Sequence, residues 1–174
     1  AFLATSISFA NELASISEFY GADAKEVERG LKTEKRIGPA AYLSPGGPYS
    51  GGTLARDINF LDGAAKEKSL TVPLINSVSV SNLEHKKWVH RKFLEKFKTL
   101  EKLSVAIWGL TYKPQTSTLR RSLAVELCDW LILKGAILNV YDPVVRDLPN
   151  HWSSRVVRCD NALEALVNTK VLVI

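Results

Sequence analysis

The feature that most constrains the fold is a repeated change of hydrophobic pattern in the second half of the chain. Residues 104–108 and 137–141 are short apolar segments typical of strands, and residues 119–134 between them follow a helical pattern. Gly135 follows the helical segment, as glycine often does where a helix ends. A strand, a helix and a second strand at this spacing predict a parallel sheet with a right-handed crossover.

The same alternation continues toward residue 174. Residues 155–157 are predicted to form a small strand, residues 160–167 a helix that Asp160 caps, and residues 170–174 another strand. These elements make up only part of an α/β sheet. Residues 103–174 are therefore predicted to be the first half of a Rossmann-like domain with a parallel sheet.

Residues 1–100 have a different pattern and are predicted to form a mainly α-helical domain. Apolar residues recur at close to 3.6-residue spacing over residues 1–20, and Gly21 suits the end of that helix. A loop over residues 33–53 is rich in proline and glycine. Three further helices are predicted, at residues 23–31, 56–70 and 73–98.

Composition and charge bound the class of protein. The 174-residue chain is 46% hydrophobic and 24% charged, as ordinary globular proteins are. No apolar run approaches the ~18–20 residues that a membrane-spanning helix needs. The net charge is +5, but the basic residues are mixed with acidic ones, and the densest cluster, residues 86–92, lies on a helical pattern. We interpret that cluster as a solvated helix face, so no membrane and no nucleic acid is expected as a partner.

The cysteines and histidines argue against a disulfide framework and against a metal site. The chain has only two cysteines, Cys128 and Cys159, and they lie far apart in the sequence. Such low cysteine usage is typical of proteins in a reducing compartment, so a cytoplasmic location is expected. Cys128 lies among core-type residues and is interpreted as a small buried hydrophobe. His85, His90 and His151 lack the spacing of metal ligands, so no metal is expected.

A glycine-rich loop over residues 45–57 carries the first group of candidate site residues. Glycine lets a backbone approach a ligand closely, and four glycines in this loop suit the wrapping of a sugar. The loop ends in Arg56 and Asp57. Asp57 suits a general acid or base, a helix cap or an ion pair with Arg56, and the residues alone leave these alternatives open.

A second loop, at residues 109–114, follows the first strand of the predicted sheet. It contains Tyr112 and Lys113, an aromatic residue and a cation. A basic residue at the carboxyl end of a parallel strand is well placed for a pyrophosphate. The alternative is an ordinary turn between a strand and a helix, because the glycine pattern of a dinucleotide-binding turn is missing.

These motifs, in their order and spacing, resemble the central and C-terminal parts of the UDP-glucose/GDP-mannose dehydrogenase family. The segments that carry the resemblance are residues 1–5, 36–39, 49–57 and 109–122. The resemblance implies a helical central domain at residues 1–100 that forms a homodimer. It also implies a partial α/β domain for the nucleotide sugar at residues 103–174, and an N-terminal NAD-binding domain that is absent from this chain.

The resemblance also gives roles to individual residues. Asp57 is expected to be the catalytic acid or base, and Thr53 stands where the family has a nucleophilic cysteine. A threonine hydroxyl is a weak nucleophile without a dedicated base. Arg56 and Arg120 are expected to contact the cofactor, NAD. The implied substrate-binding residues are Arg36, Tyr42, Leu43, Ser44, Tyr49, Gly51, Tyr112 and Lys113.

The function implied by the resemblance is that of an oxidoreductase. The chain is expected to be a fragment of an NAD-dependent nucleotide-sugar 6-dehydrogenase that oxidises the C6 alcohol of an NDP-hexose. The fragment alone is not expected to turn over, because it lacks the dinucleotide-binding domain. The alternative is a non-catalytic scaffold that binds a nucleotide sugar or forms the dimer, since that role does not require a cysteine at position 53.

Overall fold

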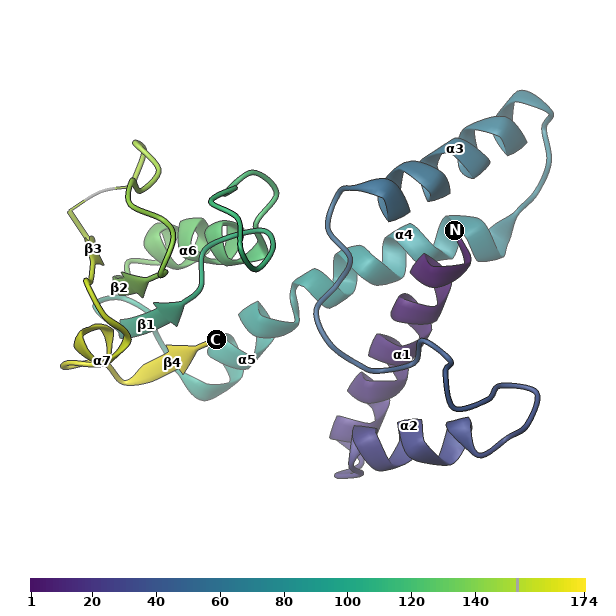
Figure 1. Cartoon of the computed structure of the whole chain (residues 1–174), viewed down its shortest axis with the longest axis horizontal. Helices are drawn as coiled ribbons and strands as arrows, with labels where there is room; N and C mark the ends of the chain where they lie inside the picture. The colour runs from purple at the N-terminus through teal and green to yellow at the C-terminus, as the bar shows by residue number, and fades with distance from the viewer. Residues whose placement is uncertain (153) are drawn as a thin grey trace. The chain divides into compact units, whose positions relative to one another are not determined.

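The computed structural model describes residues 1–152 and 154–174. The chain divides into two compact units, residues 1–88 and residues 89–174. The first unit is helical and the second contains the sheet, as Figure 1 shows. This agrees with the predicted fold class, a mainly α part followed by a partial Rossmann-like part.

The first unit is built around helix α1. The bounds of its four helices are α1 Phe2–Phe19, α2 Ala24–Lys32, α3 Thr53–Glu67 and α4 Pro73–Lys86. Helix α1 packs against the other three, and α3 also packs against α4. Small and branched side chains fill the space between them, because a close helix crossing leaves little room. The buried core consists of Ala4, Tyr49, Ile58 and Val78.

The second unit is a four-stranded parallel sheet with helices packed on it. Its elements are α5 Trp88–Lys96, which begins at the last residue of the first unit, β1 Ser104–Trp108, α6 Leu123–Leu133, β2 Ile137–Tyr141, β3 Val156–Arg158, α7 Ala162–Ala165 and β4 Val171–Val173. The strand order is β3-β2-β1-β4. Ser104 pairs with Ile137 and Trp108 with Tyr141, so β1 and β2 are in register over their whole length.

Burial on both sides of β1 explains why its sequence is continuously apolar rather than alternating. Val105, Ala106 and Ile107 are all buried, as expected for a central parallel strand. Leu131 of α6 and Phe93 of α5 belong to the same core. The two central strands thus form a rigid support for the loops that follow their carboxyl ends.

One predicted helix is divided into two in the structure. The single helix predicted at residues 73–98 is two helices, because Lys87 has φ −83° and ψ 0° and ends α4. The Trp88 indole donates to Glu18 of the first unit, at 2.9 Å, whereas Phe93 packs in the second unit. The segment after Trp88 therefore belongs to a different core, and the boundary between the two units along the chain follows residue 88.

The two later helices also begin elsewhere than predicted. The helix predicted from residue 119 begins at Leu123, because the Ser122 side chain accepts a hydrogen bond from the Val125 N–H, at 3.3 Å, and caps α6. Asn161, not Asp160, caps α7, by accepting from the Glu164 N–H at 2.9 Å. Among the described residues, no helix has both the length and the apolar character needed to cross a bilayer.

Candidate functional site

The glycine-rich loop is attached to the helices of the first unit by polar side chains. Asn11 of α1 accepts from the Gly46 N–H at 2.9 Å, and its amide donates to the Gly47 carbonyl at 3.5 Å. His85 of α4 donates through Nε2 to the Gly46 carbonyl at 2.8 Å. A loop that lacks regular structure is thereby fixed at its start, with its backbone groups satisfied.

Asn82 of α4 holds the next part of the same loop. Its side-chain oxygen accepts from the Tyr49 N–H at 2.9 Å, and its amide donates to the Tyr49 carbonyl at 2.8 Å. The Tyr49 ring is only 9% exposed, in the core of the unit. Burial raises the pKa of the Tyr49 hydroxyl, while a hydrogen bond with Ser79 lowers it in part. Tyr49 therefore anchors the loop, and its predicted contact with the sugar stays a prediction.

The loop leads directly into the amino end of α3. Gly52 is the residue before this helix and Thr53 is its first residue, with an exposed side chain. Arg56 is exposed, and Asp57 is 44% exposed with a carboxylate oxygen 3.4 Å from the α-amino nitrogen of Ala1. Positions four apart share a helix face, so Thr53 and Asp57 lie on the same side of α3. The start of α3 thus presents a hydroxyl, a guanidinium and a carboxylate to solvent.

The other residues predicted to bind substrate in the first unit lie earlier in the loop. Arg36 is 88% exposed and pairs with Glu34 at 2.9 Å, which lowers the pKa of the Glu34 carboxyl. Tyr42 is 59% exposed. The Ser44 hydroxyl donates to Glu28 of α2 at 2.6 Å. These side chains contact α2 or solvent, and their roles toward a substrate stay predictions.

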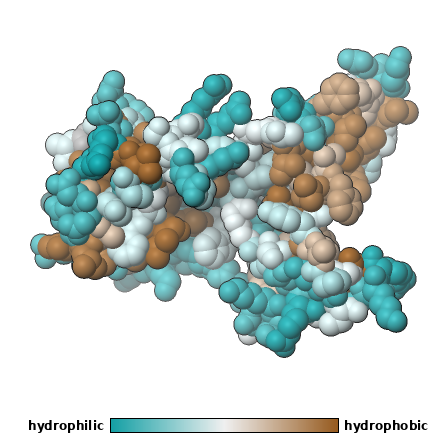
Figure 2. Space-filling view, viewed as in Figure 1, coloured by the Kyte–Doolittle hydropathy of each residue, from teal (hydrophilic) through white to brown (hydrophobic). Residues whose placement is uncertain are grey.

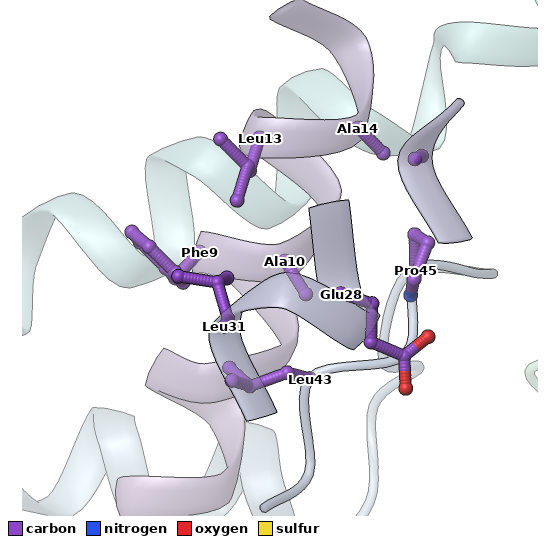
Figure 3. Close-up of a pocket in the computed structure, with 9 residues that line it drawn as sticks. Phe9, Ala10, Leu13, Ala14, Glu28, Leu31, Leu43 and Pro45 are labelled. Atoms are coloured by element: carbon purple, nitrogen blue, oxygen red, sulfur yellow. The ribbon is translucent and has the colours of Figure 1, made fainter. Parts of the chain in front are cut away.

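Leu43 lines a small apolar pocket between α1 and α2 (Figure 3). Phe9, Leu13 and Leu31 are among its apolar lining residues, and Glu28 also lines it. Hydrogen bonds from Lys32 and Ser44 are the main causes that lower the pKa of Glu28. Since these partners already satisfy Glu28, we interpret the pocket as an imperfection of helix packing rather than a ligand site.

The second loop, at residues 109–122, begins at the carboxyl end of β1. Gly109 has φ +86°, a conformation that favours glycine, and its N–H donates to the Tyr141 carbonyl at 2.8 Å. The next N–H, of Leu110, donates to the Asp142 carboxylate at 2.8 Å. The chain is thus tied to the end of β2 at two consecutive residues.

Further hydrogen bonds close the loop around Lys113. The Tyr112 N–H donates to the Thr118 carbonyl at 2.8 Å. The hydroxyls of Thr111 and Thr116 both donate to the Lys113 carbonyl, at 2.9 and 3.0 Å. The Lys113 side chain is exposed, with its ammonium 5.6 Å from the centre of the Tyr112 ring. A cation and an aromatic face are therefore presented together, on a loop of defined shape.

The strand order shows why this loop is a candidate ligand site. Strand β1 has β2 on one side and β4 on the other, so the sheet order reverses beside β1. In open α/β sheets, ligands bind outside the carboxyl ends of the strands at such a reversal. The loop that carries Tyr112, Lys113 and the exposed Arg120 follows β1 at this edge.

The turn after β1 does not fit a dinucleotide pyrophosphate. In a dinucleotide-binding turn the backbone N–H groups face the pyrophosphate. Here the Gly109 N–H faces a carbonyl and the Leu110 N–H faces the carboxylate of Asp142. The exposed cations Arg56 and Arg120 have the charge to meet cofactor phosphates, and that role stays a prediction for both.

Neither the cysteines nor the metal-binding side chains of the described residues form a site. Burial, with a contribution from Asp129, raises the pKa of the Cys128 thiol to about 12, and burial also raises the pKa of Cys159. Both thiols therefore stay protonated near neutral pH. No group of three or more His, Cys, Asp or Glu side chains within residues 1–152 and 154–174 is arranged to hold a metal ion.

Sequence reasoning missed the residues that fix the two loops. Asn11, Asn82, Thr116 and Asp142 are not among the predicted site residues, and the sequence analysis considers His85 only as a metal ligand. A signal was present for two of them. Asn11 and Asn82 are polar residues within helical patterns, and their burial follows from the loop that they hold.

The chain thus combines a helical unit that holds a glycine-rich loop with a Rossmann-like parallel sheet. Domain models of one protein family match both units. Residues 1–84 match the central domain of the UDP-glucose/GDP-mannose dehydrogenase family, and residues 106–174 match its UDP-binding domain. The chain belongs to the UDP-glucose/GDP-mannose dehydrogenase family.

Named relatives agree with this assignment. The UDP-glucose 6-dehydrogenase YwqF of Bacillus subtilis is 31% identical over 96% of this chain and 38% of its own length. The GDP-mannose 6-dehydrogenase of Pseudomonas putida is 33% identical over 87% of this chain and 34% of its own length. The chain thus spans well under half of the length of these relatives.

Solved structures of nucleotide-sugar dehydrogenases have a fold similar to that of this chain. The UDP-glucose dehydrogenase of Pyrobaculum islandicum is similar with a TM-score of 0.85 and 25% identity, over 98% of this chain and 40% of that one. The GDP-mannose dehydrogenase of Pseudomonas aeruginosa has a TM-score of 0.60 and 26% identity, over 95% of this chain and 40% of that one.

Proposed function

We propose that the chain is part of a longer NAD-dependent nucleotide-sugar 6-dehydrogenase, which oxidises the C6 alcohol of an NDP-hexose. The observation that carries the proposal is that two domains of one dehydrogenase family match in order, each with an ordered loop that presents polar side chains. The relatives are named for the 6-dehydrogenation of UDP-glucose and GDP-mannose, which supports this substrate class.

The exposed residues at the start of α3 suit the oxidation of an alcohol. A hydride leaves C6 for the nicotinamide and the hydroxyl proton leaves for a base, which gives an aldehyde. Asp57 is partly exposed and suits the acid or base role. Arg56, one residue before it, and Arg120 of the second loop supply positive charge for the cofactor phosphates.

The second loop suits the nucleotide part of the substrate. Lys113 supplies a positive charge for the diphosphate, and Tyr112 supplies a face for packing. Gly51, on the glycine-rich loop, suits close approach to the sugar. Arg36, Tyr42, Leu43 and Ser44 complete the proposed substrate side.

Thr53 affects the second oxidation step more than the first. Oxidation of the aldehyde to the acid through a thioester needs a thiol at this position, and a threonine hydroxyl is a much weaker nucleophile. Cys128 and Cys159 cannot replace that thiol, because both are buried with raised pKa values. We therefore propose that the reaction stops at the aldehyde.

The reaction is tested by NADH formation with the full-length protein, supplied with NAD and either UDP-glucose or GDP-mannose. Formation with at least one sugar supports the proposal. Lys113→Ala is expected to raise KM about tenfold, as loss of a charge-assisted contact does, while the exposed Lys134→Ala leaves KM unchanged. The absence of NADH with both sugars would overturn the catalytic proposal.

A second candidate function is a dimerisation or nucleotide-sugar-binding scaffold, and the surface of the first unit favours it. Figure 2 shows hydrophobic surface over α3. Phe60 is 72% exposed, Leu74 of α4 is 64% exposed and Phe2 of α1 is 81% exposed. Exposed apolar residues in such numbers are typical of a protein interface. We propose that this face forms a homodimer, in a cytoplasmic protein whose two cysteines stay free.

Sedimentation velocity tests the homodimer. The wild-type chain is expected to sediment as a dimer at micromolar concentration, and Phe60→Ser is expected to shift it to the monomer. The neighbouring exposed Asn59→Ser is the control and leaves the dimer unchanged. A wild-type chain that stays monomeric overturns the proposed interface.

A further inference from the structure

Asp142 is a carboxylate that is buried although it lies at the candidate ligand-binding edge of the sheet. It follows the last residue of β2, at the sheet edge where a ligand is expected, yet it is only 5% exposed. Its oxygen Oδ2 accepts from the Leu110 N–H at 2.8 Å. Its oxygen Oδ1 accepts from the N–H groups of Val144 and Val145, at 2.8 and 3.0 Å.

Both oxygens of the carboxylate are needed for this arrangement. Burial alone raises the pKa of Asp142, but the N–H groups of Leu110, Val144, Val145 and Thr111 outweigh burial, and the net shift is downward. An asparagine has only one side-chain oxygen, so its NH₂ group would face N–H donors on one side. Replacing Asp142 by asparagine therefore removes either the hydrogen bond from the Leu110 N–H or the hydrogen bonds from the Val144 and Val145 N–H groups.

The Leu110 side is directly linked to the candidate ligand residues. Leu110, whose N–H donates to Asp142, and Thr111, whose N–H contributes to the lowered pKa of Asp142, immediately precede Tyr112 and Lys113. The Lys113 carbonyl in turn accepts from the Thr111 hydroxyl. The backbone that Asp142 holds is therefore connected to Lys113 through two residues of chain and through the Thr111 hydroxyl.

We propose that Asp142 is a positioning residue that fixes Lys113 toward the diphosphate of the nucleotide. This inference rests on the proposed function, because it requires Lys113 to contact that group. Asp142 itself touches no ligand, since its oxygens already accept from backbone N–H groups. Its effect on binding is therefore exerted through Lys113.

A double-mutant cycle tests the proposal, with UDP as the probe and calorimetric titration of the 174-residue chain. Lys113→Ala is expected to weaken UDP binding about tenfold in the wild-type background. In the Asp142→Asn background the same change is expected to weaken binding less than about twofold, because Lys113 is no longer held in place. Asp147→Asn, an exposed acid on the same segment, serves as the control and keeps the tenfold effect.

Each outcome of this cycle decides a different point. If wild type does not bind UDP, the proposed function of the second loop fails, and this inference fails with it. If wild type binds UDP but Lys113→Ala costs the same in both backgrounds, Asp142 does not act through Lys113 and only this inference is overturned. The circular dichroism spectrum of Asp142→Asn at the titration temperature checks that the variant is folded.

A measurement on the wild-type chain keeps the proposal testable if Asp142→Asn does not fold. Hydrogen exchange of the Leu110 and Thr111 amides is followed with and without saturating UDP. Protection of both amides is expected to rise at least severalfold, because a bound diphosphate restrains the loop that Asp142 holds. UDP binding with unchanged protection of these amides would overturn the positioning role.

Discussion

Replacing Asn82 by alanine tests how the glycine-rich loop is held in the first unit. The Asn82 side chain is 6% exposed, and its amide pairs with the N–H and the C=O of Tyr49 at 2.9 and 2.8 Å. Removal leaves two buried backbone groups without these partners, at about 1–3 kcal/mol each. For two groups the range is about 2–6 kcal/mol. Because Asn11 and His85 still hold Gly46, we expect the lower part of this combined range, a loss of about 2–4 kcal/mol.

Urea unfolding followed by hydrogen-exchange mass spectrometry measures this loss, because peptides report each unit separately. With a slope of about 1.5 kcal/mol per M, the midpoint for peptides of α1, α3 and α4 is expected to fall by roughly 1–3 M. Peptides of the second unit are expected to keep their midpoint. Asn76→Ala, an exposed asparagine on the same helix, is the control, and its effect is expected within about 0.5 kcal/mol. Equal midpoints for the two variants would refute the anchoring role of Asn82.

Three further predictions concern the second unit. Arg121 has φ +63°, a conformation that glycine adopts more easily than arginine. Arg121→Gly is therefore expected to raise the melting temperature by about 2–6 °C, whereas the control Arg120→Gly is not. Equal effects of the two changes would contradict this reasoning. Cys128, with a pKa raised to about 12, is expected to resist iodoacetamide at pH 8 in the native chain and to react in urea, and rapid labelling of the native thiol contradicts its burial. Asp142 has a lowered pKa in the folded chain, so its stabilisation is complete above the unfolded pKa of about 4 and is lost as the pH falls through the folded value. The melting temperatures of wild type and Asp142→Asn are therefore expected to converge toward pH 2, and a constant difference would contradict that origin.

The fold could largely be predicted from hydrophobic period. Strands at residues 104–108 and 137–141 are predicted at their observed bounds. The first is an apolar run buried at its centre, and the second buries alternate residues, Leu138 and Val140. The break at Lys87 could not be predicted, since the helical pattern continues through it. It depends on Trp88 and Phe93 packing with different units, which is a tertiary property.

The candidate site could be predicted less completely. The sequence pattern places Thr53 in the loop and begins the helix at residue 56, whereas α3 begins at Thr53, so Thr53 and Asp57 lie on one helix. Asn82 is visible in the sequence as a polar residue within a helical pattern, but the backbone partners of the Asn82 amide and of the Asp142 carboxylate could not be predicted. Their importance lies in hydrogen bonds to backbone groups 32 and 33 residues away, and no local pattern encodes such pairs.

The most direct test of the proposed chemistry is the number of NADH molecules formed per nucleotide sugar by the full-length protein, beside its Thr53→Cys variant. We predict about one NADH and an aldehyde product for the parent, and about two NADH for the variant, because the thiol restores the second oxidation. About two NADH per sugar in the parent would contradict this account, since the oxidation would then be complete without a thiol at position 53.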